Sequence, residues 1–170
     1  MREQREIVQI KGWEEDDLDL LFQLNAPEMM NHLGGPEREE KVFSRHQRYL
    51  ALKDKGSMYS IQLQPQNEKV GSVGFWHKSV DGEEAYEVGW SVLPSFQGKG
   101  IATRATKLAI KEALAKNNWA IHAFPSIDNP GSNAICRKLH FSFLTECEFE
   151  YPPGNLMRCN HWRLEASSIR

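Results

Sequence analysis

The segment from Ala85 to Phe124 constrains the fold more than any other part of the chain. Ala85–Leu93 predicts a strand, because apolar side chains alternate along it: Tyr86, Val88, Trp90 and Val92 share one face. The glycine-rich run Gln97–Gly100 follows. Ile101–Asn117 then predicts a strong helix, and Trp119–Phe124 a short, nearly all-apolar strand. Strand, glycine loop, helix and strand in this order indicate a right-handed crossover between parallel strands.

The segments before this crossover predict a helical region followed by a hairpin. We expect a strand, a helix, a loop and a second helix over Ile7–Lys11, Glu14–Leu24, Met29–Pro36 and Pro36 to about Lys55. Gly56 is expected to end the second helix. The hairpin pairs Met58–Gln64 with Val70–His77.

The segments after the crossover predict one more helix and two strands. The helix runs from Asn129 to Leu139, and the strands cover Phe141–Tyr151 and Met157–Glu165. In the first of these strands, alternation predicts one buried face, made of Phe141, Phe143, Cys147, Phe149 and Tyr151. The whole pattern is that of an α/β (α+β) fold in which an antiparallel half precedes one parallel unit.

Composition excludes several classes of protein. The 170 residues are expected to form one domain, residues 1–170, with a net charge of −2 and no basic run of the kind that binds nucleic acid. No apolar stretch suits a bilayer, and the N-terminus lacks the apolar core of a signal peptide. Cys136, Cys147 and Cys159 form no Cys-x-x-Cys pair, so we expect no metal. Free thiols favour a cytoplasmic setting.

The run from Gln97 to Ala102 carries the chemistry. Glycines allow backbone conformations with positive φ, and the first amides of a helix have no internal partner. Such a turn suits a phosphate or pyrophosphate, although a tight turn without a ligand is an equally open interpretation. The run lacks the pattern of a P-loop and that of a dinucleotide-binding fold.

The same run resembles the Gln/Arg-x-x-Gly-x-Gly/Ala signature of the GNAT acetyltransferases at every fixed position. Asn129-x-x-Ser132 and Lys138–Phe141 resemble a second family segment. The loop Met30–Pro36 and the strand Met157–Leu164 resemble the RimJ/RimL branch. The resemblance implies a twisted, mostly antiparallel sheet of six to seven strands with about four helices. His140 departs from the family, which usually has glycine there, at a position that often takes a helix C-cap conformation.

The resemblance implies that acetyl-coenzyme A is bound as the acetyl donor. Backbone amides of Gly98, Lys99, Gly100, Ile101, Ala102 and Thr103, in the loop that Gln97 opens, would hold its pyrophosphate. Lys99 is either a phosphate ligand or a solvated loop lysine. The strand end at Val92 and Leu93 would pair with the pantetheine arm, and a backbone N–H there would polarise the thioester carbonyl. Asn129 would contact the arm, cap the helix, or do both.

Amine acetylation also needs a base, because the acceptor is protonated near pH 7. Glu87 is our candidate, since its same-face neighbours Gly89 and Ser91 are small and leave room for a ligand. A solvated strand glutamate is the competing interpretation. His32, His77 and Glu148 are weaker candidates.

The proton for the departing thiolate would come from the last helix. Where many family members have a tyrosine, this chain has Cys136, for which we favour a packing role. Ser132 is the alternative donor, or only a residue of the first turn of that helix.

A sensor that binds acetyl-coenzyme A without turnover stays open as an alternative. The order of elements argues against a nucleotide or phosphate binder of a doubly wound class, because an antiparallel half precedes only one crossover unit. The acceptor is a protein N-terminus or a small-molecule amine. We expect its site to be walled by Met29–Pro36, by Trp76 and His77, and by the turn Tyr151–Asn155. We expect a monomer or a homodimer that binds no nucleic acid and no membrane.

Overall fold

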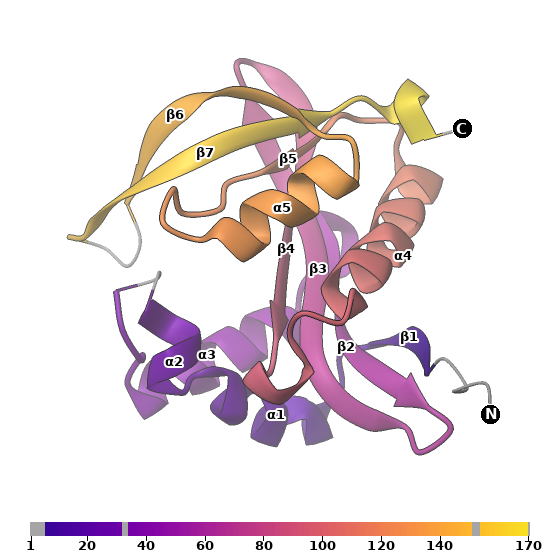
Figure 1. Ribbon diagram of the computed structural model, residues 1–170, viewed down its shortest axis with the longest axis vertical. Helices are drawn as coiled ribbons and strands as arrows, with labels where there is room; N and C mark the ends of the chain where they lie inside the picture. The colour runs from indigo at the N-terminus through magenta and orange to yellow at the C-terminus, as the bar shows by residue number, and fades with distance from the viewer. Residues whose placement is uncertain (1–5, 32–33, 151–153, 170) are drawn as a thin grey trace.

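The computed structural model describes residues 6–31, 34–150 and 154–169 (Figure 1). In this part of the chain seven strands form one sheet, in the order β1-β2-β3-β4-β5-β7-β6. The strands are β1 Ile7–Gly12, β2 Gly56–Gln64, β3 Glu68–Val80, β4 Glu83–Val92, β5 Ile121–Ala123, β6 Ser142–Glu150 and β7 Leu156–Leu164. The helices are α1 Leu18–Leu24, α2 Pro27–Met30, α3 Glu39–Leu50, α4 Ile101–Lys116 and α5 Pro130–Lys138.

The predicted hairpin and crossover are both confirmed. β1 to β4 pair antiparallel in chain order, and α4 then leads to β5, which pairs parallel with β4. β7 joins β5 antiparallel, and β6 forms the outer edge beside β7. The sheet is therefore mostly antiparallel with one parallel pair, as predicted. None of the described helices is long and apolar enough to cross a bilayer.

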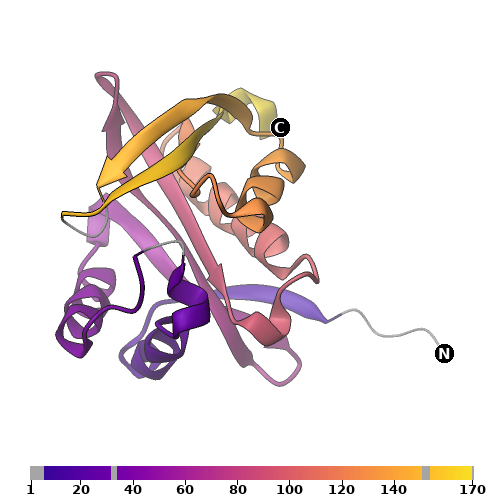
Figure 2. The same ribbon diagram turned by 60° about the vertical axis from the view of Figure 1, so that its left-hand side comes forward.

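Helices cover both faces of the sheet (Figure 2). α1, α2 and α3 lie on one side of β3 and β4, and α4 and α5 lie on the other. The face under α4 buries the predicted stripe of β4, in which Tyr86, Val88 and Val92 are buried and Trp90 is partly buried. Trp13, Leu21, Leu24, Val42 and Met58 fill the layer between α1, α3 and the sheet.

The helical region before the hairpin differs from the prediction at two points. Pro27–Met30 forms the short helix α2 where we expected a loop to begin, and Pro27 occupies its first turn. α3 begins at Glu39, not at Pro36, because Asn25 holds the backbone of Glu37 extended. The Asn25 side chain donates to the Glu37 carbonyl and accepts from its amide, both at 2.8 Å.

α3 also ends earlier than expected, at Leu50, and a short 3₁₀ turn over Lys53–Lys55 leads into β2. Gly56 is the first residue of that strand and the C-cap of the 3₁₀ turn, so it does not end α3 as predicted.

The predicted buried face of Phe141, Phe143, Cys147, Phe149 and Tyr151 is wrong at Phe143, whereas Phe141, directly before β6, is buried and Cys147 is partly buried. Phe143 is 52% exposed and its neighbour Leu144 is 47% exposed. The register of β6 against β7 shifts between Phe143 and Thr145, so simple alternation does not continue through this point. β6 is an edge strand of the sheet, where an alternating pattern is a weaker predictor of burial than in a central strand. Tyr151 lies outside the described residues.

Candidate active site

β4 and β5 are hydrogen-bonded neighbours over a short stretch only, at Tyr86 with Ile121 and Glu87 with His122. β5 ends at Ala123 while β4 continues to Val92, so the two strands part beyond this stretch. A cleft of about 1140 Å³ begins there. It is lined by β4 from Glu87 to Val92, the glycine loop and the start of α4, Ala123–Ser126 and α5, and by α2 and α3 from the opposite side.

The glycine loop has the geometry of an anion site. Gly98 and Gly100 have φ of 76° and 77°, and a Cβ on either would meet no atom within 4 Å. Gly100 is the N-cap of α4, and no side chain caps this end. The amides of Ile101, Ala102 and Thr103 therefore have no acceptor within the helix, and these residues line the cleft. The predicted glycine turn at a helix N-terminus is present.

Arg104 fastens this loop, a role that sequence reasoning missed. Its guanidinium donates to the carbonyls of Gly100 and Lys99, each at 3.3 Å, and to that of Glu6 at 3.1 Å. A cation in the first turn of a helix is opposed by the helix dipole. An anion bound at the same end would offset that cost. An arginine in the first turn of a predicted helix was therefore the signal in the sequence that could have indicated the role of Arg104.

Gln97 links the loop to the strand end and to α2. Its side-chain nitrogen donates to the carbonyl of Val92 at 2.8 Å and lies 3.6 Å from the sulfur of Met29. All three residues line the cleft. Leu93 does not line it, and its amide already donates to the carbonyl of Val70 at 2.8 Å.

Lys99 is exposed to solvent. Lys99 does not line the cleft, and its ammonium group lies 5.7 Å from the centroid of the Phe96 ring. The structure therefore favours the solvated loop lysine over the phosphate ligand.

Glu87 lies on the wall of the cleft with its carboxylate held by Lys78. Lys78 Nζ donates to Glu87 Oε1 at 2.9 Å, and the glutamate side chain is 15% exposed. Burial raises the pKa of Glu87 above its ordinary value, while the charge and hydrogen bond of Lys78 oppose that rise. The Lys78 ammonium also lies 4.3 Å from the centroid of the Phe124 ring. Sequence reasoning missed Lys78, whose meeting with Glu87 depends on the register of β3 and β4.

The space that small residues leave beside Glu87 is partly occupied. A Cβ on Gly89 would lie 2.8 Å from Cη2 of Trp76, so the indole of Trp76 covers this glycine. Trp76 and Gly89 both line the cleft, and the indole therefore shapes the wall next to the carboxylate.

α5 closes the cleft on the side away from α2. Asn129 caps the helix, accepting from the amide of Ser132 at 3.1 Å, and both residues line the cleft. Trp90 Nε1 donates to Ser132 Oγ at 3.2 Å, which leaves the proton of this hydroxyl available to another group. Asn133 anchors α5 to β7, because its side-chain oxygen accepts from Asn160 and from Trp162, each at 2.9 Å.

Comparison with known families decides what this arrangement belongs to. Residues 8–142 match the family model described as the acetyltransferase (GNAT) domain. The chain belongs to the GNAT acetyltransferase family. It is thus an acyltransferase by family, and the predicted membership is confirmed. A search of curated protein sequences finds no match.

Solved GNAT structures share the fold over nearly their whole length. One is an acetyltransferase from Salmonella typhimurium that modifies the N-terminal serine of ribosomal protein L7/L12; identity is 22%, TM-score 0.76, and coverage 93% of this chain and 94% of that one. A RimL acetyltransferase in complex with coenzyme A has 20% identity, a TM-score of 0.75 and 93% coverage of both chains. Spermidine N-acetyltransferase from Vibrio cholerae, in complex with coenzyme A and spermine, has 15% identity, a TM-score of 0.78 and coverage of 95% and 97%.

Cys136 lies in the core of this GNAT fold and not in the cleft. Its side chain is fully buried in the core cluster that includes Ile110 and Trp162, and it does not line the cleft. Burial raises the pKa of its thiol to about 12. The packing role that we favoured for this residue agrees with the position.

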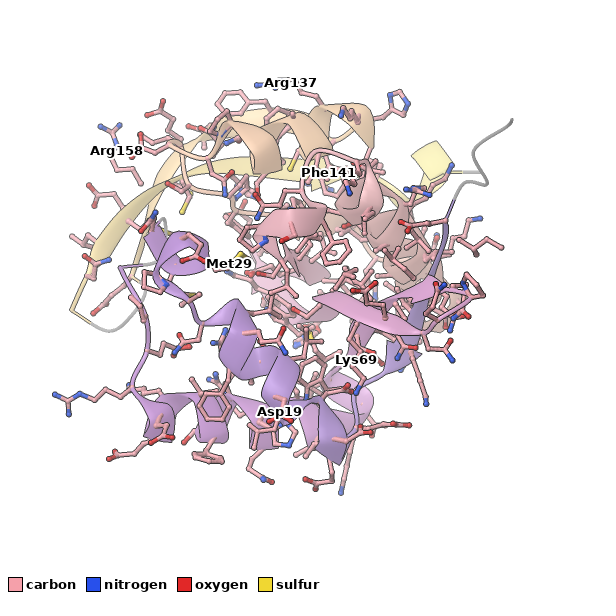
Figure 3. All side chains as sticks on the ribbon, turned by 60° about the horizontal axis from the view of Figure 1, so that its bottom comes forward. Asp19, Met29, Lys69, Arg137, Phe141 and Arg158 are labelled. Atoms are coloured by element: carbon pink, nitrogen blue, oxygen red, sulfur yellow. The ribbon has the colours of Figure 1, made fainter. Side chains whose placement is uncertain are left out.

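The three segments that we expect to wall the acceptor site are described in part. Met29, Met30, Trp76 and His77 line it, as expected, and Figure 3 shows Met29 directed from α2 toward the centre of the molecule. Of the turn after β6, residues 151–153 lie outside the described residues, as does His32. Glu148 is exposed and does not line the cleft. Among the described residues no cluster of histidine, cysteine or acidic side chains could hold a metal ion.

Proposed function

We propose that the chain transfers the acetyl group of acetyl-coenzyme A to a primary amine by direct attack through a tetrahedral intermediate. One observation carries the proposal: a single cleft contains both the open N-terminus of α4 and the half-buried carboxylate of Glu87. The N-terminus of α4 suits binding of a pyrophosphate, and the carboxylate of Glu87 suits removal of a proton from an amine.

At the coenzyme end, the loop from Gly98 to Thr103 supplies backbone amides to the phosphates. Arg104 keeps the loop carbonyls turned away from that anion by hydrogen-bonding them itself. The carbonyl of Val92 would accept from an amide of the pantetheine arm. Gln97 already donates to this carbonyl, which has a second lone pair to accept from the arm.

At the acceptor end, Glu87 acts as the base. A carboxylate with a raised pKa is a better proton acceptor at neutral pH than an ordinary glutamate. Lys78 contributes in a second way, because its positive charge beside Glu87 disfavours an ammonium ion and favours the neutral amine that attacks.

The departing thiolate needs at most a weak acid. Ser132 is the donor that the geometry favours, since its hydroxyl lines the cleft and accepts from Trp90. Cys136 is buried outside the cleft, and we propose that it is dispensable for turnover. The carbonyl of the thioester would be polarised by a backbone N–H near Val92 other than that of Leu93, which is already bonded.

The acceptor is either a protein N-terminus or a small amine, and structural neighbours of both kinds are found. Cys136, Cys147 and Cys159 are free, which supports the cytoplasmic setting predicted from the sequence.

The test is release of coenzyme A thiol from acetyl-coenzyme A in the presence of a panel of amines. The panel contains short peptides with free N-termini, polyamines, amino sugars and amino acids. Thiol release that depends on one of these amines supports the transferase. Tight binding of acetyl-coenzyme A with no release for any amine would favour the sensor instead.

A further inference from the structure

The cleft carries more positive than negative charge, although the chain as a whole is slightly acidic. Its lining includes five basic residues, Arg45, Arg48, Lys55, Lys78 and Lys138, and two acidic ones, Glu28 and Glu87. The net charge of the chain is −2. Lys138 is on α5 at the coenzyme end, and the other four lie on α3, the turn after it and β3, on the acceptor side.

Two of these four cations form ion pairs with acidic residues, and the other two do not within the described part of the chain. Lys78 is paired with Glu87, and Arg45 is paired with Glu37 at 2.6 Å, outside the lining of the cleft. Arg48 and Lys55 are exposed, and neither has an ion pair with a described residue. His77, also in the lining, is paired with Glu84.

The strand register gives the distance between this charge and the base. Lys55 directly precedes Gly56, which lies opposite Trp76, and Trp76 lies opposite Glu87. Adjacent strands are about 4.8 Å apart, so the backbones of Gly56 and Glu87 are separated by roughly 10 Å. Arg48 lines the same wall from α3. If the amine of a bound molecule reaches Glu87, the part of that molecule about two to three residue lengths from the amine would therefore lie beside these two cations.

We infer that the acceptor is a primary amine that carries carboxylate groups roughly 10 Å from its nitrogen, and that Arg48 and Lys55 bind them. An acidic side chain at the second or third residue of a protein N-terminus has this chemistry. These cations disfavour a polycationic amine as the acceptor. Among the described residues that line the cleft, Glu28 is the only acidic one besides Glu87. This inference rests on the proposed amine acetylation.

The test compares kcat/KM for acetylation of three peptides, Ser-Asp-Glu-Ala, Ser-Ala-Ala-Ala and Ser-Lys-Lys-Ala, each with an amidated C-terminus. We expect the acidic peptide to exceed the basic one by about fivefold, since exposed ion pairs are individually weak and two of them together give a preference of this order. The preference should shrink as salt is raised. The variant Arg48→Glu/Lys55→Glu should reverse it.

The matched control is Lys41→Glu/Lys111→Glu, which changes the charge equally at two exposed lysines outside the cleft and should keep the preference. The inference about the acceptor would be overturned if the three peptides were acetylated at equal rates, or if both double variants lost the preference alike. The proposed transferase activity would still hold in either case. Failure to acetylate any amine, including those of the wider panel, would remove the proposed function itself.

Discussion

Two opposing influences act on the carboxyl group of Glu87. Burial raises its pKa and is the larger, while Lys78 at 2.9 Å lowers it. The side chain is thus poised as a base, and the two effects can be separated by substitution. The residue-scale predictions follow from this pair and from the strained backbone at His140.

Removing the base should damage turnover more than removing the thiol. An alkylammonium with a pKa near 10 is only about one part in a thousand neutral at pH 7, so a positioned base contributes substantially. We expect Glu87→Gln to lose at least about tenfold in kcat at neutral pH, with part of the loss recovered at high pH. Cys136→Ala should lose only a few-fold. Parallel pH–rate profiles decide this, and a Glu87→Gln profile superimposable on wild type would refute the assignment.

Lys78→Met should shift the pH dependence in a defined direction. Without the ammonium, burial alone acts on Glu87 and its pKa rises further. The active carboxylate is then protonated at higher pH, so the acid limb of the kcat/KM profile moves upward. Lys78→Arg is the matched control and should keep the limb near its original position. A limb that does not move in Lys78→Met means that this residue only packs.

His140 holds a left-handed backbone conformation, with φ of 66°. The amide of Phe141 donates to the carbonyl of Cys136 at 3.0 Å and closes the end of α5, as a C-cap does. Glycine takes this conformation without the Cβ contact that strains other residues. We expect His140→Gly to raise the free energy of unfolding by about 1 kcal/mol in urea denaturation. His140→Ala keeps the strain, and equal stability of the two variants would contradict this explanation.

At the scale of elements, β5 and β7 bring two histidines into contact. His122 Nδ1 and His161 Nε2 lie 2.7 Å apart, and His122 is buried. Burial, with a smaller contribution from the facing charges of His161, Arg163 and Lys78 and against that of Glu165, lowers the pKa of His122 to about 4. Burial lowers the pKa of His161 as well. Both rings are therefore neutral at pH 7.

This pair makes the stability of the sheet depend on pH. The unfolded chain binds a proton at His122 below about pH 6.5, whereas the folded chain does so only near pH 4. Stability is therefore lost as the pH falls through this window, by about 2 kcal/mol between pH 7 and pH 5 for this group. We expect His122→Phe to show a smaller loss than wild type in urea denaturation at the two pH values. An unchanged loss would mean that His122 is not the group responsible.

Prediction from sequence succeeded where the signal is local. The alternation in β4, the glycine loop and the period of α4 are properties of consecutive residues, and all three are present. It failed where the structure depends on distant partners. The start of α3 is set by Asn25, 12 residues before Glu37, and the exposure of β6 follows from its place at the sheet edge.

The candidate site divides in the same way. The anion loop is readable from spacing, because its glycines and the helix start are contiguous. The Lys78–Glu87 pair, the Trp76 indole over Gly89 and the charges of α3 are not, because they require the register of β2, β3 and β4. Sequence reasoning therefore named the candidate base but neither its partner nor the charge of the proposed acceptor wall.

At the scale of the whole molecule, the parting of β4 and β5 places two walls of different origin around one cleft. One wall comes from residues after β4, where we propose that the coenzyme binds, and much of the other comes from α2 and α3 near the N-terminus, where we propose that the acceptor binds. The account depends on the coenzyme phosphates lying at the start of α4. If the phosphates lie elsewhere, the roles proposed for Val92, Gln97, Ser132 and Glu87 are wrong together, because each assumes that the coenzyme binds in this cleft.

The measurement that tests this claim most directly is a calorimetric titration of coenzyme A into wild type, Gly100→Glu and Gly82→Glu. Gly100 and Gly82 have φ of 77° and 80°, and a Cβ on either meets nothing within 4 Å. The two variants therefore introduce the same strain and the same charge, but only Gly100 lines the cleft. We predict that Gly82→Glu binds coenzyme A as wild type does and that Gly100→Glu loses at least about tenfold in affinity. Equal affinity for all three proteins would contradict the placement of the phosphates.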